Sequence, residues 1–163
     1  MPTEKKPKME PLLPVDAPER RRLPPLLRKA WYGLNQAFRR RIAHLQITPD
    51  QFTVMRTLRE CEGLTQRQLT QFMSSDPNTV ASLLERMEKA GLVERRPHAK
   101  DRRAHQVELK PLGHRKYELA RELAVKLQTE VLERLPLDRR EAFLVDLAAV
   151  ADACRDSASS SID

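Results

Sequence analysis

Residues 92–110 read LVERRPHAKDRRAHQVELK, and their pattern of aliphatic and charged side chains indicates the class of fold. Aliphatic and charged residues alternate at both of its ends, around Val93 and around Val107, which predicts two β-strands. The segment between them, residues 97–103, has no aliphatic side chain larger than alanine and carries three Lys and Arg residues. The sequence therefore predicts an antiparallel hairpin with a basic tip.

The residues before the hairpin predict a helix-turn-helix. Thr65 and Gln68 have the spacing of a capping box, and Asp76 can cap a second helix that opens with proline. These signals predict a short helix over 65–72, the turn MSSD and a longer helix over 76–90. Because the longer helix leads directly into the hairpin, the hairpin tip is expected to project beside it.

The longer helix has one apolar face and one polar face. The expected buried residues, at helical spacing, are Val80, Leu83, Leu84, Met87 and Ala90. The opposite face carries small hydrogen-bonding side chains near its amino end, which let a helix approach base edges in a major groove. The candidate DNA-binding residues on this face are Asn78, Thr79, Ser82 and Arg86. A solvated helix face is the alternative, and the basic hairpin beside it favours DNA.

The hairpin tip supplies the second part of the candidate site. Arginine suits the minor groove, whose negative potential deepens where the groove narrows. We therefore expect Lys100, Arg102 and Arg103 to contact DNA from a wing. Asp101 is expected to support the wing, because its carboxylate can hold a neighbouring guanidinium in place.

Helical periodicity also covers the rest of the chain. Further helices are predicted over about 24–45, 49–60, 111–134 and 138–154, the last with Asp138 and Glu141 at its start. Apolar residues in the first and the last two of these recur at alternating spacings of three and four, which suits helix-on-helix packing. We favour a dimer formed by these helices, and a monomeric intramolecular bundle is the alternative.

The predicted fold class is mostly α with a small β-hairpin wing, a winged helix-turn-helix flanked by dimerisation helices. Seven of the 12 prolines lie within residues 1–25 among basic residues, and this composition is typical of a disordered arm. The expected divisions are a basic, proline-rich arm over 1–23, a dimerisation helix over 24–48, the winged helix-turn-helix DNA-binding domain over 49–110, dimerisation helices over 111–154 and a frayed tail over 155–163.

The composition favours a polyanionic partner. There are 30 Lys and Arg against 23 Asp and Glu, giving a net charge of +7 and a pI near 9.8. Aromatic residues make up only 4%, which disfavours stacking platforms for single strands and leaves double-stranded DNA as the expected partner. The chain shows no secretory signal and no apolar run of membrane-spanning length, so we expect a cytoplasmic protein with no membrane partner.

No catalytic, metal or cofactor site is predicted. The four histidines never fall at a metal-ligand spacing, and there is no glycine-rich phosphate loop or nucleophile elbow. Cys61 lies beside acidic residues that disfavour a reactive thiolate, and Cys154 lies on an apolar stripe, so both are interpreted as structural. The alternative to DNA binding is therefore a winged helix used for protein interaction and not an enzyme. That alternative predicts an apolar or acidic outward face on the longer helix.

Residues 64–113 resemble the winged helix-turn-helix of MarR-type transcriptional regulators. The resemblance rests on Gly91-Leu92-Val93 followed by Arg95-Arg96, on the Asp-x-Arg pattern met by Asp101 and Arg103, and on Gly113 near the start of the next helix. Lys110 departs from the family pattern, which usually has threonine there, and this bears on how the next helix is capped.

The resemblance implies a homodimer that binds a pseudo-palindromic operator, usually as a repressor. It also implies release from DNA when a small aromatic or phenolic acid binds between the dimer helices and the winged domain, or when a cysteine is oxidised. It assigns no effector-binding residues in this chain. Neither Cys61 nor Cys154 has the amino-terminal placement of the sensing cysteine in peroxide-responsive members.

Overall fold

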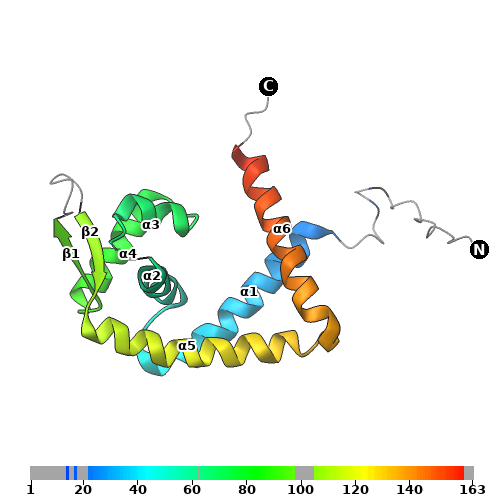
Figure 1. Cartoon of the computed structure of the whole chain (residues 1–163), viewed down its shortest axis with the longest axis horizontal. Helices are drawn as coiled ribbons and strands as arrows, with labels where there is room; N and C mark the ends of the chain where they lie inside the picture. The colour runs from blue at the N-terminus through cyan, green and yellow to red at the C-terminus, as the bar shows by residue number, and fades with distance from the viewer. Residues whose placement is uncertain (1–13, 15–16, 18–21, 62, 98–104, 160–163) are drawn as a thin grey trace, which may run out of the picture. The chain divides into compact units, whose positions relative to one another are not determined.

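The computed structural model describes Pro14, Ala17 and residues 22–61, 63–97 and 105–159. In these residues the chain forms α-helices, short 3-10 helices and one antiparallel pair of strands (Figure 1). The chain divides into two units, residues 1–36 and residues 37–163. The predicted fold class, a mostly helical chain with a β-hairpin, is confirmed.

The elements follow the predicted order. They are α1 (Leu23–Ile42), η1 (Ala43–Leu45), α2 (Pro49–Glu60), α3 (Gln66–Phe72), α4 (Pro77–Lys89), β1 (Val93–Pro97), β2 (His105–Leu109), α5 (Pro111–Leu132), η2 (Leu137–Arg139) and α6 (Arg140–Ser159), where η marks a 3-10 helix. The helices α2 to α5 agree with the predicted ranges to within two residues.

The helix starts show why the local signals were reliable. Thr48 and Thr65 each form a complete capping box with a glutamine three residues later, Gln51 and Gln68. At the end of α4, Gly91 has a φ of 70°, where a side chain is strained. Its N–H and that of the next residue bond back to carbonyls of α4, which ends the helix and turns the chain into β1.

The last helix differs from its prediction at both ends. Asp138 lies inside η2, and α6 begins at Arg140, two residues after the predicted start. The helix then continues to Ser159, and the hydroxyls of Ser157 and Ser159 donate to carbonyls four residues earlier. Residues 155–159 are therefore helical where a frayed tail was expected, and 160–163 lie outside the described residues.

The buried core of the second unit centres on α4. Val80, Leu83, Leu84 and Met87 are buried, as predicted, whereas Ala90 is exposed because it is the residue after the last helical turn. Side chains of α2, α3, β1, β2 and α5 pack in this core, together with Ile42 at the end of α1. Figure 1 shows α2 between α3 and α5, with the hairpin beside α4.

The hairpin is tied to α5 and to the start of α3. Its register pairs Val93 with Leu109, and the Val107 N–H donates to the Leu64 carbonyl at 2.8 Å. The Leu92 carbonyl accepts the Lys110 N–H at 2.9 Å, which brings the start of α5 against β1. Gly113 lies at this approach, because an added Cβ would be 2.2 Å from the Leu92 carbonyl oxygen.

Candidate nucleic-acid interface

The polar face of α4 is exposed along its whole length. Asn78, Thr79, Ser82 and Arg86 are all exposed, opposite the buried side that fixes the helix to the core. The Arg86 guanidinium Nε donates to the Ser82 carbonyl at 3.3 Å, so the arginine lies along the helix. The structure thus brings these four predicted residues onto one face of a rigidly held helix.

Asp76 organises the first turn of α4. Its carboxylate accepts the N–H groups of Asn78 and Thr79 at 3.0 and 2.9 Å. It also accepts the Thr79 hydroxyl at 2.5 Å. This last bond, followed by the backbone bonds, holds the pKa of the Asp76 carboxyl below its usual value, so the group is a carboxylate at neutral pH.

The predicted wing contacts fall outside the described residues. Lys100, Asp101, Arg102 and Arg103 all lie in the segment 98–104. Nothing in the described chain therefore tests their roles, and they stay predictions. The two strands that lead to this segment are described and show how its base is held.

The base of the hairpin carries paired charges. The Arg96 guanidinium lies 2.5 Å from a Glu94 oxygen and 3.3 Å from a Glu108 oxygen. Gln106 donates to the other Glu108 oxygen at 2.7 Å. The positive charge of Arg96 is therefore locally balanced, and in the sequence the surplus cations of the hairpin belong to residues 98–104.

Glu88 joins α4 to the hairpin. One of its carboxylate oxygens accepts the Arg95 N–H at 3.2 Å, and the other lies 3.3 Å from the Arg95 guanidinium Nε. Both side chains are about one-third exposed, at 32%. No sequence pattern predicts this contact, because residues seven apart meet here only after the chain reverses at Gly91.

Glu88→Ala is expected to loosen the hairpin from α4 and to lower the free energy of unfolding by about 1 kcal/mol. The expected loss is small because a partly exposed ion pair contributes little to stability. Glu85→Ala is the control, because Glu85 forms its ion pair with Lys89 on the same helix and is only a more distant charge to Arg95. Urea denaturation gives the stabilities, and hydrogen exchange at the Arg95 amide reports the local loosening. Equal effects of the two substitutions would show that Glu88 does not tie the hairpin down.

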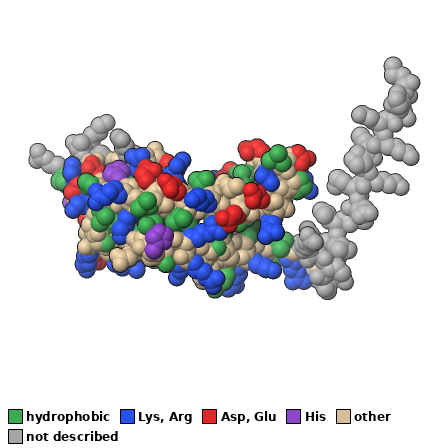
Figure 2. Space-filling view, turned by 90° about the horizontal axis from the view of Figure 1, so that it is seen from below, with side chains coloured by type: hydrophobic (Ala, Val, Ile, Leu, Met, Phe, Trp, Pro, Cys, Tyr) green, Lys and Arg blue, Asp and Glu red, His purple; other side chains and the backbone are tan. Residues whose placement is uncertain are grey.

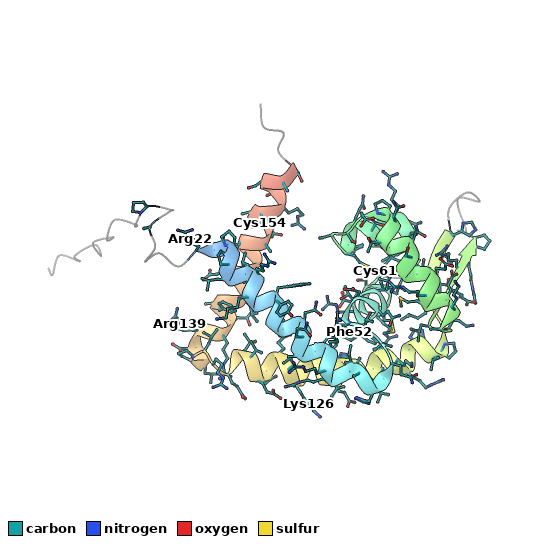
Figure 3. All side chains as sticks on the ribbon, turned by 180° about the vertical axis from the view of Figure 1, so that it is seen from behind. Arg22, Phe52, Cys61, Lys126, Arg139 and Cys154 are labelled. Carbon is teal, nitrogen blue, oxygen red and sulfur yellow. The ribbon has the colours of Figure 1, made fainter. Side chains whose placement is uncertain are left out.

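An aromatic cluster fixes the start of α5 to α2. The Phe52 ring contacts Phe38 edge-on at 4.9 Å between centroids and stacks on Tyr117 at 5.6 Å. Arg59 covers the Tyr117 ring at 5.9 Å and pairs with Glu118 at 3.3 Å. Phe52 lies where α2 faces α5 (Figure 3). These contacts join α2, which precedes the helix-turn-helix, to α5.

The basic run Arg39–Arg41 is only partly neutralised. Arg41 forms two hydrogen bonds with the Glu130 carboxylate, and these raise the pKa of Arg41 and lower that of Glu130. Arg39 and Arg40 are exposed and have no ion-pair partner among the residues that the structure describes. They are candidates for a general attraction of anions, because residues 20–47 contain no Asp or Glu.

Metal and membrane sites are not supported by the described part of the chain. It contains no group of three or more His, Cys, Asp and Glu residues that could hold a metal ion. None of its helices is both long and apolar enough to cross a membrane. Cys61 at the end of α2 and Cys154 on α6 are free thiols (Figure 3).

Comparison with known proteins agrees with this geometry. The model of the MarR family matches residues 47–105, which span α2 to the start of β2. The transcriptional regulator HosA of Escherichia coli O127:H6 is 32% identical over 124 residues, covering 73% of this chain and 92% of HosA.

Solved structures extend the comparison to DNA complexes. The transcriptional repressor CouR bound to a 23-mer DNA duplex is similar with a TM-score of 0.73 and 28% identity, covering 79% of this chain and 92% of CouR. A mutant MarR from E. coli complexed with operator DNA has a TM-score of 0.73 and 26% identity, covering 78% and 92%. Together with the match to the family model and the identity to HosA over most of its length, these similarities show that the chain belongs to the MarR family of transcriptional regulators.

Proposed function

We propose that the protein is a homodimeric repressor that binds a pseudo-palindromic operator in double-stranded DNA. The observation that carries the proposal is the exposed polar face of α4, Asn78 to Arg86, on a helix whose other face is buried. In this proposal α4 enters the major groove and the hairpin tip reaches the adjacent minor groove. The similarity to CouR on a DNA duplex and to MarR with operator DNA supports it.

Exposed apolar side chains support the dimer. In the described chain α6 has no buried residue, and on it Phe143, Val145 and Leu147 are 43%, 60% and 38% exposed. Large apolar residues are also exposed on α1 and α5, among them Trp31, Tyr32, Leu119, Val125 and Val131. Figure 2 shows hydrophobic side chains at the surface among Lys and Arg. A helix with this composition needs a covering partner, and a second copy supplies the same apolar helices.

The competing monomeric bundle would bury α6 within its own chain, and the described α6 buries none of its residues. The competing protein-interaction module predicts an apolar or acidic outward face on α4. The exposed face carries Asn78, Thr79 and Ser82 instead, which are suited to base edges.

Release by a small aromatic or phenolic acid is the finer part of the proposal. It rests on family membership, and no residue of this chain is assigned to the effector. Titrating such acids against the protein–operator complex tests it, and the expected result is a saturable loss of DNA affinity. If no acid of this class weakens the complex at millimolar concentration, this part of the proposal is wrong while DNA binding stands.

Selection of bound duplexes from a random pool tests the proposed function. A dimer with two copies of α4 is expected to select two symmetry-related half-sites about 10 base pairs apart. Alanine at Asn78 or Ser82 is expected to relax the preference at defined positions, by about 1–3 kcal/mol for a residue that contacts a base. If both substitutions weaken binding equally to operator and random DNA, α4 is not the reading element.

The wing is expected to contribute charge. Arg102→Ala or Arg103→Ala removes one phosphate contact per wing, so the slope of log affinity against log salt is expected to flatten by about 1.8 per dimer. Lys126→Ala on α5 is the charge-matched control and is expected to leave the slope unchanged. An unchanged slope for both arginine variants would place the wing away from DNA.

Asp101 is expected to strengthen DNA binding, although its negative charge alone would weaken it. Removing a carboxylate near phosphates by itself tightens binding, whereas a carboxylate that orients an arginine is needed for affinity. We expect Asp101→Ala to weaken binding in a fluorescence anisotropy series at several salt concentrations. Tighter binding by the variant across the series would show that Asp101 does not orient an arginine of the wing.

A further inference from the structure

The first turn of α4 contains a hydroxyl whose hydrogen is already committed. The Thr79 Oγ1 lies 2.5 Å from Asp76 Oδ2, and Asp76 Oδ1 accepts the backbone N–H groups of Asn78 and Thr79. A carboxylate has no hydrogen to donate, so the threonine hydroxyl must be the donor of the shared bond. Thr79 therefore keeps only its oxygen lone pairs and its methyl group for a partner.

Thr79 is also well placed to meet a partner. It is exposed, on the same face of α4 as Asn78 and Ser82. The bond from its hydroxyl to Asp76 holds the side chain, and the bond from its backbone N–H to the same carboxylate holds the backbone beneath it. A hydroxyl normally rotates to donate or accept as its partner requires, and here that freedom is removed.

We propose that Asp76 makes Thr79 an acceptor-only reader, which selects a base that presents an amino group in the major groove at the position it faces. In the major groove adenine offers its N6 amino group and cytosine its N4 amino group, whereas guanine and thymine present acceptors at O6 and O4. A lone pair of Thr79 can accept from the first two and repels the last two. This inference rests on the proposed DNA binding by α4 and adds the chemistry of one operator position.

This arrangement is expected to lower the affinity of the protein for DNA of any sequence. Asp76 places a negative charge at the end of α4 that approaches DNA, and it occupies backbone N–H groups that would otherwise attract phosphate. A capping serine would satisfy the helix without the charge. The acidic cap is therefore expected to lower affinity for all DNA while sharpening the choice of base.

Four variants separate these effects in the full-length protein. Asp76→Ser keeps a helix cap and removes the charge, and Asp50→Ser is the charge-matched control in the first turn of α2. Thr79→Val keeps the shape and removes the hydroxyl, and Thr79→Ser keeps the hydroxyl. Each variant is checked for folding by thermal unfolding, taken through selection from a random duplex pool, and measured by anisotropy on the selected sites.

The wild type, Asp50→Ser and Thr79→Ser are expected to select adenine or cytosine at one position in each half-site. Thr79→Val is expected to lose that choice alone, with about a tenfold loss of discrimination there. Asp76→Ser is expected to admit guanine and thymine at the same position, because the freed hydroxyl can donate, and to bind random DNA more tightly than wild type.

Two results would overturn the inference and leave the proposed function standing. One is a wild-type motif in which the position sensitive to Thr79→Val holds guanine or thymine. The other is an Asp76→Ser protein that folds, binds and selects the same base at every position as wild type. A wild-type protein that selects no motif at all would overturn both the inference and the proposed function.

Discussion

Gly113→Ala is expected to destabilise the winged module by about 3 kcal/mol or more. The new Cβ would lie 2.2 Å from the Leu92 carbonyl oxygen and 3.0 Å from a Leu109 methyl carbon. The carbonyl is a backbone atom that also accepts the Lys110 N–H at 2.9 Å, so it cannot withdraw without breaking that bond. Relief of the clash therefore requires α5 to move away from the hairpin.

Gly33→Ala is the matched control. Gly33 lies inside α1, and an added Cβ there meets nothing within 4 Å. Alanine is the better helix former, so this change is expected to be neutral or to stabilise the protein by about 0.5–1 kcal/mol. Urea denaturation at one fixed protein concentration, followed by circular dichroism, compares the two. A loss below about 1 kcal/mol for Gly113→Ala would contradict the close packing of α5 on β1.

Ending the chain at Pro136 is expected to convert the proposed dimer to single chains and to weaken operator binding by about two orders of magnitude or more. The truncation removes η2 and α6, whose exposed apolar residues the second copy is proposed to cover. Two half-sites bound by one linked pair gain a large effective concentration, and that gain is lost when the chains separate.

Sedimentation and anisotropy measure the two halves of this prediction. The full-length protein is expected to sediment near twice 18.8 kDa and the truncated one as a single chain. A chain ending at Ser159, which retains all of α6, is the control and is expected to remain a dimer. A full-length protein that is monomeric at micromolar concentration and still binds the operator would exclude the dimer.

The parts of the fold that the sequence predicted depend on neighbours along the chain. Capping boxes join residues three apart, such as Thr65 and Gln68, and an apolar helix face recurs every three or four residues, as in α4. Gly91 follows the same kind of rule, because a helix that ends before a strand needs a residue tolerant of positive φ. These signals act over one or two turns, so a single sequence contains them.

The parts that the sequence did not predict depend on how separate elements meet. Glu88 contacts Arg95 only after the chain has reversed at the hairpin, and Gly113 approaches the Leu92 carbonyl only after α5 has packed there. Ser74 adopts a φ of 49° in the turn before α4 although serine carries no strong preference for that region. The committed hydroxyl of Thr79 likewise required the distance to the Asp76 carboxylate, which no spacing rule supplies.

Sequence-specific binding is tested by comparing the affinity for the selected operator with that for a scrambled duplex of the same length and base composition. Fluorescence anisotropy at one fixed, near-physiological salt concentration measures both. Sequence-specific readout by α4 predicts binding to the operator at least about a thousandfold tighter than to the scrambled duplex. Equal affinities for the two duplexes, falling together as salt is raised, would show a basic protein held by phosphates alone and would contradict the proposed function.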